Sequence, residues 1–203
     1  ELPLGRPSCP RPDEFLISDC NQRAVQQIEG WADWPVRAAL LVGPRKSGRT
    51  LLGRAFLNRT RGILFDDAER GSETDLFHAW NRAQADRRPL LIIADEPPPT
   101  WEIRLPDLRS RIAATPLLRI GPPDDPLVAD LMQYLFDRRE LVIAPELIRW
   151  LARRVERTYL QVLRVVEAME EDAMIRGTRI LSMQGARAAL AQRGWSPPTG
   201  EAA

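Results

Sequence analysis

The sequence predicts an α/β protein, with a parallel sheet of about four strands covered by helices and followed by a small all-helical domain. Four short apolar runs alternate with stretches of helical spacing, a pattern typical of a parallel sheet. The pattern changes at the sequence GPPDDP, residues 121–126, and almost everything after it has helical spacing. Hydrophobic residues make up 44% and charged residues 28% of the chain, which indicates a globular protein rather than a disordered one.

These patterns divide the 203 residues into four parts. We expect an extended, proline-rich segment at 1–14, an α/β base domain at 15–121, a helical lid domain at 122–193 and a disordered tail at 194–203.

In the base domain, each apolar run is followed by a turn signal. The predicted strands are residues 38–42, 63–65, 90–93 and 117–120. The predicted helices begin after residues 19–21, run over residues 50–58, begin at Ser72 and run over residues 106–112. Ser72 is a good N-cap, with Asp75 three residues on. Only about a dozen residues separate Thr50 from Ile63, enough for one helix but not for a fifth strand.

The lid has clear helix boundaries. Asp125 before Pro126 predicts a helix start, with a capping side chain followed by proline in the first turn. Apolar stripes then follow one another at helical spacing, and Ser182 is expected to cap a final helix.

The stretch GPRKSGRT, residues 43–50, has the spacing of a phosphate-binding loop. It joins a predicted strand to a predicted helix, so backbone N–H groups and a helix N-terminus would surround an anion. Arg49 stands where such loops usually carry lysine, and a guanidinium is less suited than an ammonium to a point contact with phosphate. Thr50 would hold Mg²⁺ through its hydroxyl. The expected nucleotide contacts are Gly43, Pro44, Arg45, Lys46, Ser47, Gly48, Arg49, Thr50, Leu51 and Asp95.

Nucleotide hydrolysis also needs carboxylates at the end of a neighbouring strand. Asp66-Asp67 follows one predicted strand and Asp95-Glu96 follows another. From the pattern alone the second pair is more attractive, and the pattern does not decide between them.

Composition excludes several classes of function. One histidine and two cysteines leave no cluster of metal ligands and no disulfide framework. No apolar run is long enough to cross a bilayer and no targeting segment is visible, so we expect a cytoplasmic protein without membrane contacts. A net charge of +1 gives no sign of sequence-specific DNA binding.

Three segments carry a resemblance to a known family. They are residues 105–125, LPDLRSRIAATPLLRIGPPDD; residues 153–169, RRVERTYLQVLRVVEAM; and residues 88–101, RPLLIIADEPPPTW. From about Phe15 to Leu190 the chain resembles the AAA+ ATPase group of the bacterial initiator DnaA and, more narrowly, the shortened DnaA-like regulators of the Hda type. The resemblance implies an AAA+ base with a helical lid that binds ADP or ATP with Mg²⁺.

The resemblance also implies roles for particular residues. Residues 90–96 resemble the sensor-1 strand, which makes Asp66 the Mg²⁺-shell residue and Asp67 the acid that polarises water, with Asp95 near the sensor-1 position. Arg111 matches the arginine finger that reaches the nucleotide of a neighbouring subunit, and Arg109 is the nearby alternative. We take Arg111 and Asp67 as the catalytic candidates.

The chain departs from the family pattern at Arg49, at a four-stranded rather than five-stranded sheet, and at Leu160, which occupies the position of the sensor-2 arginine. Retention of the finger while the contacts to the chain's own γ-phosphate decay predicts action on the nucleotide of a partner.

In the family, that partner is ATP-bound DnaA, and Hda-type regulators promote its hydrolysis while docked on the sliding clamp, the polymerase β subunit, through an N-terminal peptide. Leu2, Pro3 and Leu4 stand where that peptide would be. Two alternatives remain open: a self-sufficient ATPase that acts as a loader or remodeller, and a pseudo-ATPase adaptor without nucleotide. The sequence also leaves open whether the protein forms a homodimer.

Overall fold

The computed structural model describes residues 15–195, and the predicted strands form one parallel sheet. The strands are β1 (Ala38–Val42), β2 (Ile63–Phe65), β3 (Leu90–Ala94) and β4 (Leu117–Arg119). Their order in the sheet is β2-β3-β1-β4, and every neighbouring pair is parallel. The predicted fold class, with its four-stranded sheet, is confirmed.

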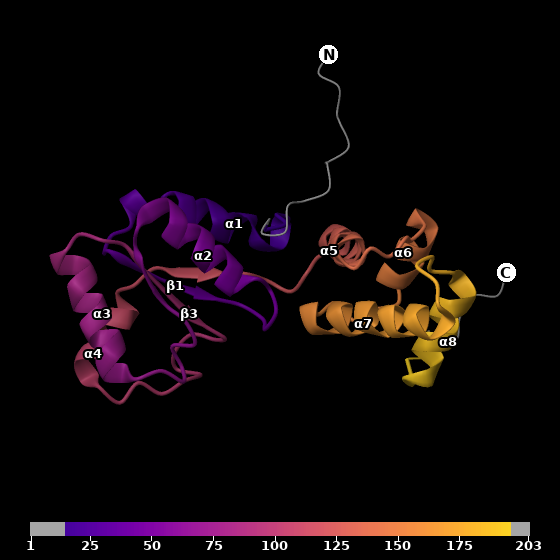
Figure 1. The fold of residues 1–203 in the computed structure, drawn as a ribbon. Helices are drawn as coiled ribbons and strands as arrows, with labels where there is room; N and C mark the ends of the chain where they lie inside the picture. The colour runs from indigo at the N-terminus through magenta and orange to yellow at the C-terminus, as the bar shows by residue number, and fades with distance from the viewer. Residues whose placement is uncertain (1–14, 196–203) are drawn as a thin grey trace, which may run out of the picture. The chain divides into compact units, whose positions relative to one another are not determined.

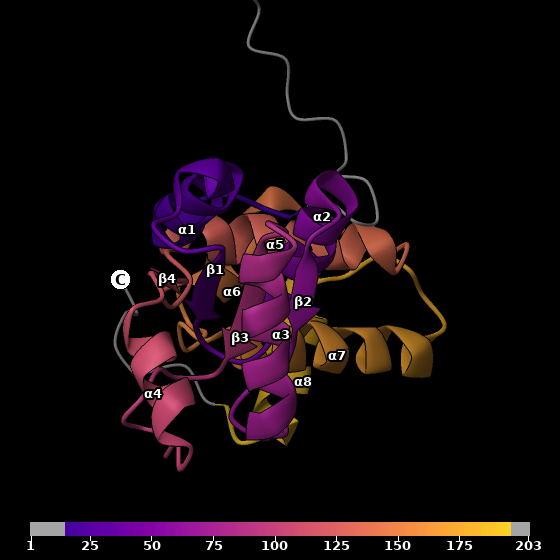
Figure 2. The same ribbon diagram turned by 90° about the vertical axis from the view of Figure 1, so that its left-hand side faces the viewer.

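Helices cover both faces of this sheet (Figures 1 and 2). They are α1 (Asp19–Glu29), α2 (Arg49–Thr60), α3 (Glu73–Ala85) and α4 (Pro106–Ala113), with a short 3₁₀ turn at Trp31–Asp33. One face packs against α3 and α4, and the other packs against α1 and α2. Since successive side chains of a strand point to opposite faces, the central strands β1 and β3 are buried throughout.

The parallel arrangement brings three loops to one edge of the sheet. In the register between β1 and β3, Val42 pairs with Ala94, and in that between β2 and β3, Phe65 pairs with Ile92. The residues that follow β1, β2 and β3 therefore leave the sheet at neighbouring points. The glycine loop and both acidic pairs lie at this edge, where ligands of open α/β sheets bind.

After the base come four lid helices, α5 (Asp125–Arg138), α6 (Pro145–Ala152), α7 (Tyr159–Arg176) and α8 (Met183–Gln192). They enclose a separate apolar core in which Met132, Phe136, Leu151 and Val166 are buried. An isolated parallel bridge between Val142 and Ile180 joins the segments that precede α6 and α8.

Two helix caps show how the sequence sets the boundaries in the lid. Ser182 caps α8 as expected, since its hydroxyl accepts a hydrogen bond from the Gly185 N–H at 3.1 Å. The expected cap of α5 is wrong by one residue: the Asp124 carboxylate accepts from the Leu127 N–H at 2.9 Å, and Asp125 is the first helical residue. A cap satisfies the N–H two or three positions on, so Asp124 is the residue placed to do it. Asp125 instead forms an ion pair with Arg157.

The chain divides into two compact units, residues 17–122 and a second that contains residues 123–195. Within the described residues, no helix is both long and apolar enough to span a bilayer.

Candidate functional site

The glycine loop after β1 is held in a conformation that needs its two glycines. A Cβ on Gly43 would lie 2.8 Å from the carbonyl oxygen of Ile120, so a side chain there would collide with the backbone after β4. Gly48 has φ of 86°, a left-handed conformation that favours glycine. Lys46 between them also has a positive φ, of 67°. The close backbone approach at Gly43 and the positive φ angles at Lys46 and Gly48 give the chain the tight curvature of an anion-binding loop.

Helix α2 begins directly after this loop at Arg49, and its N-cap residue, Gly48, has no side chain that could cap the first N–H groups. Those groups are therefore free to donate to an anion, and the helix dipole favours negative charge at the same place. The Ser47 hydroxyl is buried and has no hydrogen-bond partner among residues 15–195. A phosphate against the loop would supply the acceptors that these groups lack, so the loop fits the group that its spacing predicts.

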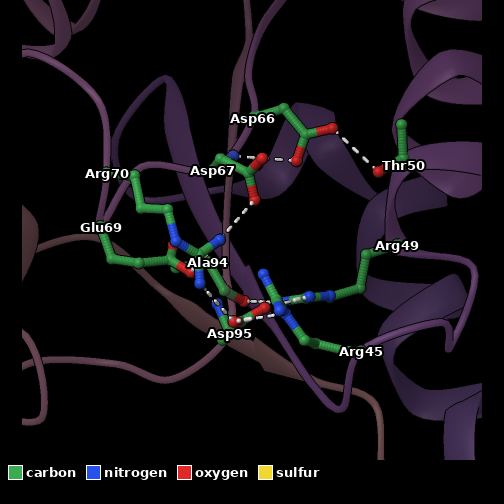
Figure 3. A network of polar contacts seen from close by, with 9 residues as sticks. All are labelled: Arg45, Arg49, Thr50, Asp66, Asp67, Glu69, Arg70, Ala94 and Asp95. Carbon is green, nitrogen blue, oxygen red and sulfur yellow. Dashed lines mark hydrogen bonds and ion pairs between the residues drawn. The ribbon is translucent and has the colours of Figure 1, made fainter. Parts of the chain in front are cut away.

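At one side of the loop, Thr50 meets Asp66 (Figure 3). The Thr50 hydroxyl donates to the Asp66 carboxylate at 2.8 Å, and both side chains are exposed. The other oxygen of Asp66 accepts from the Asp67 N–H at 2.9 Å. Of the two acidic pairs, Asp66-Asp67 is thus the one whose carboxylate reaches Thr50. A hydroxyl and one carboxylate suit Mg²⁺, which usually takes few protein ligands and keeps phosphate oxygens and water.

On the other side, the Arg49 side chain is bonded to the end of β3 (Figure 3). Its guanidinium donates to the Ala94 carbonyl oxygen and to the Asp95 carboxylate, at the end of β3. The residue is only 9% exposed. In this structure the charge that stands at the lysine position is therefore used inside the protein.

Asp95 is the centre of this second cluster (Figure 3). Besides Arg49, its carboxylate binds Arg45 at 3.1 Å and Arg70 at 3.2 Å. Burial, the largest single influence, raises the pKa of Asp95, but the hydrogen bonds and charges of the three arginines together outweigh it and hold the pKa below its ordinary value. Asp95 is therefore ionised at neutral pH.

The backbone of Asp95 also fixes the loop. Its carbonyl oxygen accepts from the Gly43 N–H at 3.3 Å, and its N–H donates to the Glu69 carboxylate at 3.2 Å. Arg70 extends the cluster towards β2 through a contact to Asp67 at 3.4 Å. Sequence reasoning missed Glu69 and Arg70, although both stand close behind Asp66-Asp67, where the chain leaves the same edge of the sheet.

The two finger candidates differ in their surroundings. The Arg111 guanidinium lies 4.2 Å from the centre of the Phe77 ring and 4.9 Å from that of Trp80, and it donates to the Asn81 side chain. All three partners belong to α3, so Arg111 is held against its own domain. Arg109 is exposed, and no partner for its side chain is found within residues 15–195.

The remaining predicted residues belong to the glycine loop and the start of α2, to the N-terminal segment and to α7. Leu51 is half-buried in the first turn of α2, and Pro44 is half-buried in the loop. Leu2, Pro3 and Leu4 lie outside the described residues. Leu160, at the expected sensor-2 position, lies in the first turn of α7 and is 42% exposed.

No protein-family model matches the chain, but solved structures do. Domain III of the replication initiation protein DnaA from Thermotoga maritima superposes with a TM-score of 0.72 over 92% of this chain and 97% of that one, at 14% identity. AMPPCP-bound DnaA from Aquifex aeolicus gives 0.65 over 89% and 68%, at 14% identity. A RuvB variant from Thermotoga maritima gives 0.64 over 89% and 70%, at 11% identity. The chain therefore has the DnaA-like AAA+ fold.

Proposed function

We propose that this chain is an AAA+ regulator of replication initiation that holds an adenine nucleotide, ADP in its resting state, and hydrolyses ATP weakly itself. One observation carries the proposal: the half of the site that would bind Mg²⁺ is intact, while the charge at the lysine position is turned inward. Thr50 and Asp66 are in contact, whereas Arg49 is bonded to Ala94 and Asp95.

Each part of the site would contribute to holding a nucleotide. The loop N–H groups would bind the phosphates, with Lys46 exposed beside them, whereas Arg45 is also exposed but is paired with Asp95. Thr50 and Asp66 would hold Mg²⁺, which supplies positive charge to the phosphate oxygens when it is bound. Asp67, the acid proposed to polarise water, is in contact with Arg70 at 3.4 Å, so part of its carboxylate is already engaged within the protein. These features favour binding over turnover.

The proposed target is DnaA, on the basis of the sequence resemblance and of a fold shared with DnaA domain III. In this proposal, Leu2, Pro3 and Leu4 anchor the protein to the sliding clamp, and an arginine of α4 reaches the ATP site of DnaA. Arg111 is the finger that the resemblance implies, but it must leave Phe77 and Trp80 to act in trans. Arg109 is already exposed and needs no such movement.

The experiment measures hydrolysis of DnaA-bound ATP with the protein, the clamp and DNA present. We compare wild type with Arg111→Ala and Arg109→Ala, and with a variant in which Leu2 and Leu4 are both alanine. A loss of about 10³-fold or more in stimulation for one arginine variant, in the range of known arginine fingers, supports the proposal and identifies the finger. Stimulation at the wild-type rate by both arginine variants contradicts it.

The Arg49–Asp95 pair favours a second candidate, an adaptor that binds no nucleotide. An internal carboxylate already neutralises the arginine that a phosphate would otherwise meet. Calorimetric titration with ADP and Mg²⁺ separates the two candidates, because the adaptor gives no binding heat. Arg49→Lys is the informative variant: under the first proposal, a free ammonium tightens binding of ADP about tenfold, about 1.4 kcal/mol.

A further inference from the structure

A surface of the lid combines arginines and tryptophans and plays no part in the site described above. We call it the arginine–tryptophan face. It consists of Trp150, Arg153, Arg154, Arg164, Arg187 and Trp195. These residues come from α6, α7, α8 and the turns after α6 and α8, all within the second compact unit.

Three hollows share this face, and Arg154 lines each of them. The first, about 430 Å³, is also lined by Arg164 and Trp195. The second and third, about 360 and 320 Å³, are both lined by Trp150, and Arg187 contributes to the third. One arginine at the junction of three hollows can contact a ligand that extends across all of them.

Most of the positive charge on the face is not paired with a carboxylate of the described residues. Within residues 15–195, none of Arg153, Arg154, Arg164 and Arg187 has an ion pair with a carboxylate, and all four are exposed. The neighbouring arginines behave differently, since Arg149 pairs with Glu146 at 3.1 Å and Arg193 pairs with Glu171.

One further acid bears on this balance. Glu156 lines the first hollow, and Glu146, which lines the second, is paired with Arg149. Among the described residues that line the three hollows, the four arginines therefore meet one carboxylate without an ion pair. The face thus has an excess of positive charge, which an anionic ligand with several charges would satisfy.

Flat groups lie beside these charges. The Arg154 guanidinium is 4.6 Å from the centre of the Trp150 ring, and the Arg187 guanidinium is 5.9 Å from it. Trp195 has a similar neighbour in Arg193, at 5.8 Å. Both rings are half-buried and so present part of their surface to solvent. Indole rings and guanidinium planes are the surfaces on which unpaired bases stack.

We propose that the arginine–tryptophan face binds single-stranded nucleic acid without sequence preference. The arginines contact successive phosphates, and the bases stack on the exposed parts of Trp150 and Trp195 or on the guanidinium planes. A single strand is the form that fits, because bases in a duplex are already stacked on one another. An acidic peptide would satisfy the charges but offers no regular series of flat rings. The inference uses the lid alone and does not depend on nucleotide binding by the base.

The test is the fluorescence anisotropy of a labelled 20-nucleotide oligothymidylate, titrated with the full chain at several salt concentrations. The main variant is Arg154→Ala with Arg187→Ala. Its matched control is Arg176→Ala with Arg179→Ala, which removes the same charge from exposed, ion-paired arginines of the same unit. We expect the main variant to weaken binding at least tenfold and to reduce the salt slope by one to two, and the control to change binding less than threefold.

A tryptophan variant and two competing polyanions, inorganic polyphosphate and polyglutamate, test the role of the bases. Trp150→Ala should weaken binding of the oligonucleotide while leaving binding of inorganic polyphosphate unchanged. The proposal is overturned if the oligonucleotide does not bind, if the control variant loses as much affinity as the main one, or if polyphosphate competes equally well per charge. Tighter binding of polyglutamate than of the oligonucleotide also overturns it, in favour of an acidic protein partner. Circular dichroism melts of each variant establish that the lid remains folded.

Discussion

Two carboxylates at the same edge of the sheet have opposite surroundings. Asp66 follows β2, is exposed, and accepts hydrogen bonds from the Thr50 hydroxyl and from the Asp67 N–H. Asp95 follows the adjacent strand β3 and is surrounded by three guanidiniums. Both residues follow a short apolar strand, and the sequence pattern alone does not decide between them.

The comparison shows that partners rather than position decide what each carboxylate can do. A carboxylate beside a hydroxyl and open to solvent can accept a metal ion. One that already binds three arginines has little capacity left, and it also withdraws those arginines from other anions. The predictions below disrupt these two clusters, and one disrupts the separate contact between Arg111 and α3.

The largest effect is expected for Asp95→Ala. Removal of the carboxylate leaves the Arg49 guanidinium buried, with the Ala94 carbonyl as its one remaining partner among residues 15–195. Loss of one partner of a buried ion pair typically costs about 3–5 kcal/mol, and the partial exposure of Asp95 places this case near about 3 kcal/mol. Urea unfolding followed by circular dichroism measures the change.

Glu96→Ala is the control, because Glu96 is the exposed neighbouring carboxylate and has no ion pair within the described residues. We expect its unfolding midpoint to stay within experimental error of wild type. Equal midpoints for the Asp95 and Glu96 variants would show that the arginine cluster does not stabilise the fold.

A smaller loss is expected for Arg111→Ala. The substitution removes two cation–π contacts, to Phe77 and Trp80, and a hydrogen bond to Asn81. Together these contribute about 1–2 kcal/mol at a half-buried position. Arg109→Ala on the same helix should change the free energy of unfolding by less than about 0.5 kcal/mol. If both variants unfold at the same urea concentration, the α3–α4 contact of Arg111 is energetically unimportant.

The pH dependence of stability should reveal the contributions of two carboxylates, Asp95 in the arginine cluster and Glu73 at the start of α3. The pKa of Asp95 is lowered from its ordinary 3.8, and that of Glu73 is lowered from 4.5 because the N–H groups of Arg104 and Leu105 donate to its carboxylate. Carboxyls with a lowered folded-state pKa stabilise the protein above their ordinary pKa, and this contribution is lost as the pH falls through those values towards the folded-state pKa. Unfolding at pH 7, 5, 4 and 3 should show this loss, and Asp95→Asn should reduce its steepness. An unchanged pH profile in Asp95→Asn contradicts the assignment.

Much of the fold could be predicted because its signals are local. Apolar strands, the glycine loop and caps such as Ser72 are determined by a few adjacent residues, and Ser72 does cap α3 by accepting from the Asp75 N–H at 3.2 Å. The α5 cap was misplaced by one residue because two aspartates precede Pro126, and both are compatible with a helix start.

The contacts of the site could not be predicted in the same way. Arg49 and Asp95 are 46 residues apart, and Arg111 and Asn81 are 30 apart. No local pattern states which arginine of an arginine-rich chain will meet which acid. The order of the strands decides this, since β3 lies between β1 and β2 and brings Asp95 to the loop.

The smallest change in stability is expected for Thr50→Ala, and it is the sharpest test of the other cluster. The Thr50–Asp66 hydrogen bond lies in solvent, so its loss should alter the free energy of unfolding by no more than about 0.5 kcal/mol. If these two oxygens hold Mg²⁺, the variant should nevertheless lose the part of ADP affinity that depends on Mg²⁺. Thr50→Ser keeps the hydroxyl and should retain it. Titrations of ADP with and without Mg²⁺ make the comparison, and equal Mg²⁺ dependence in the alanine and serine variants would place the metal elsewhere.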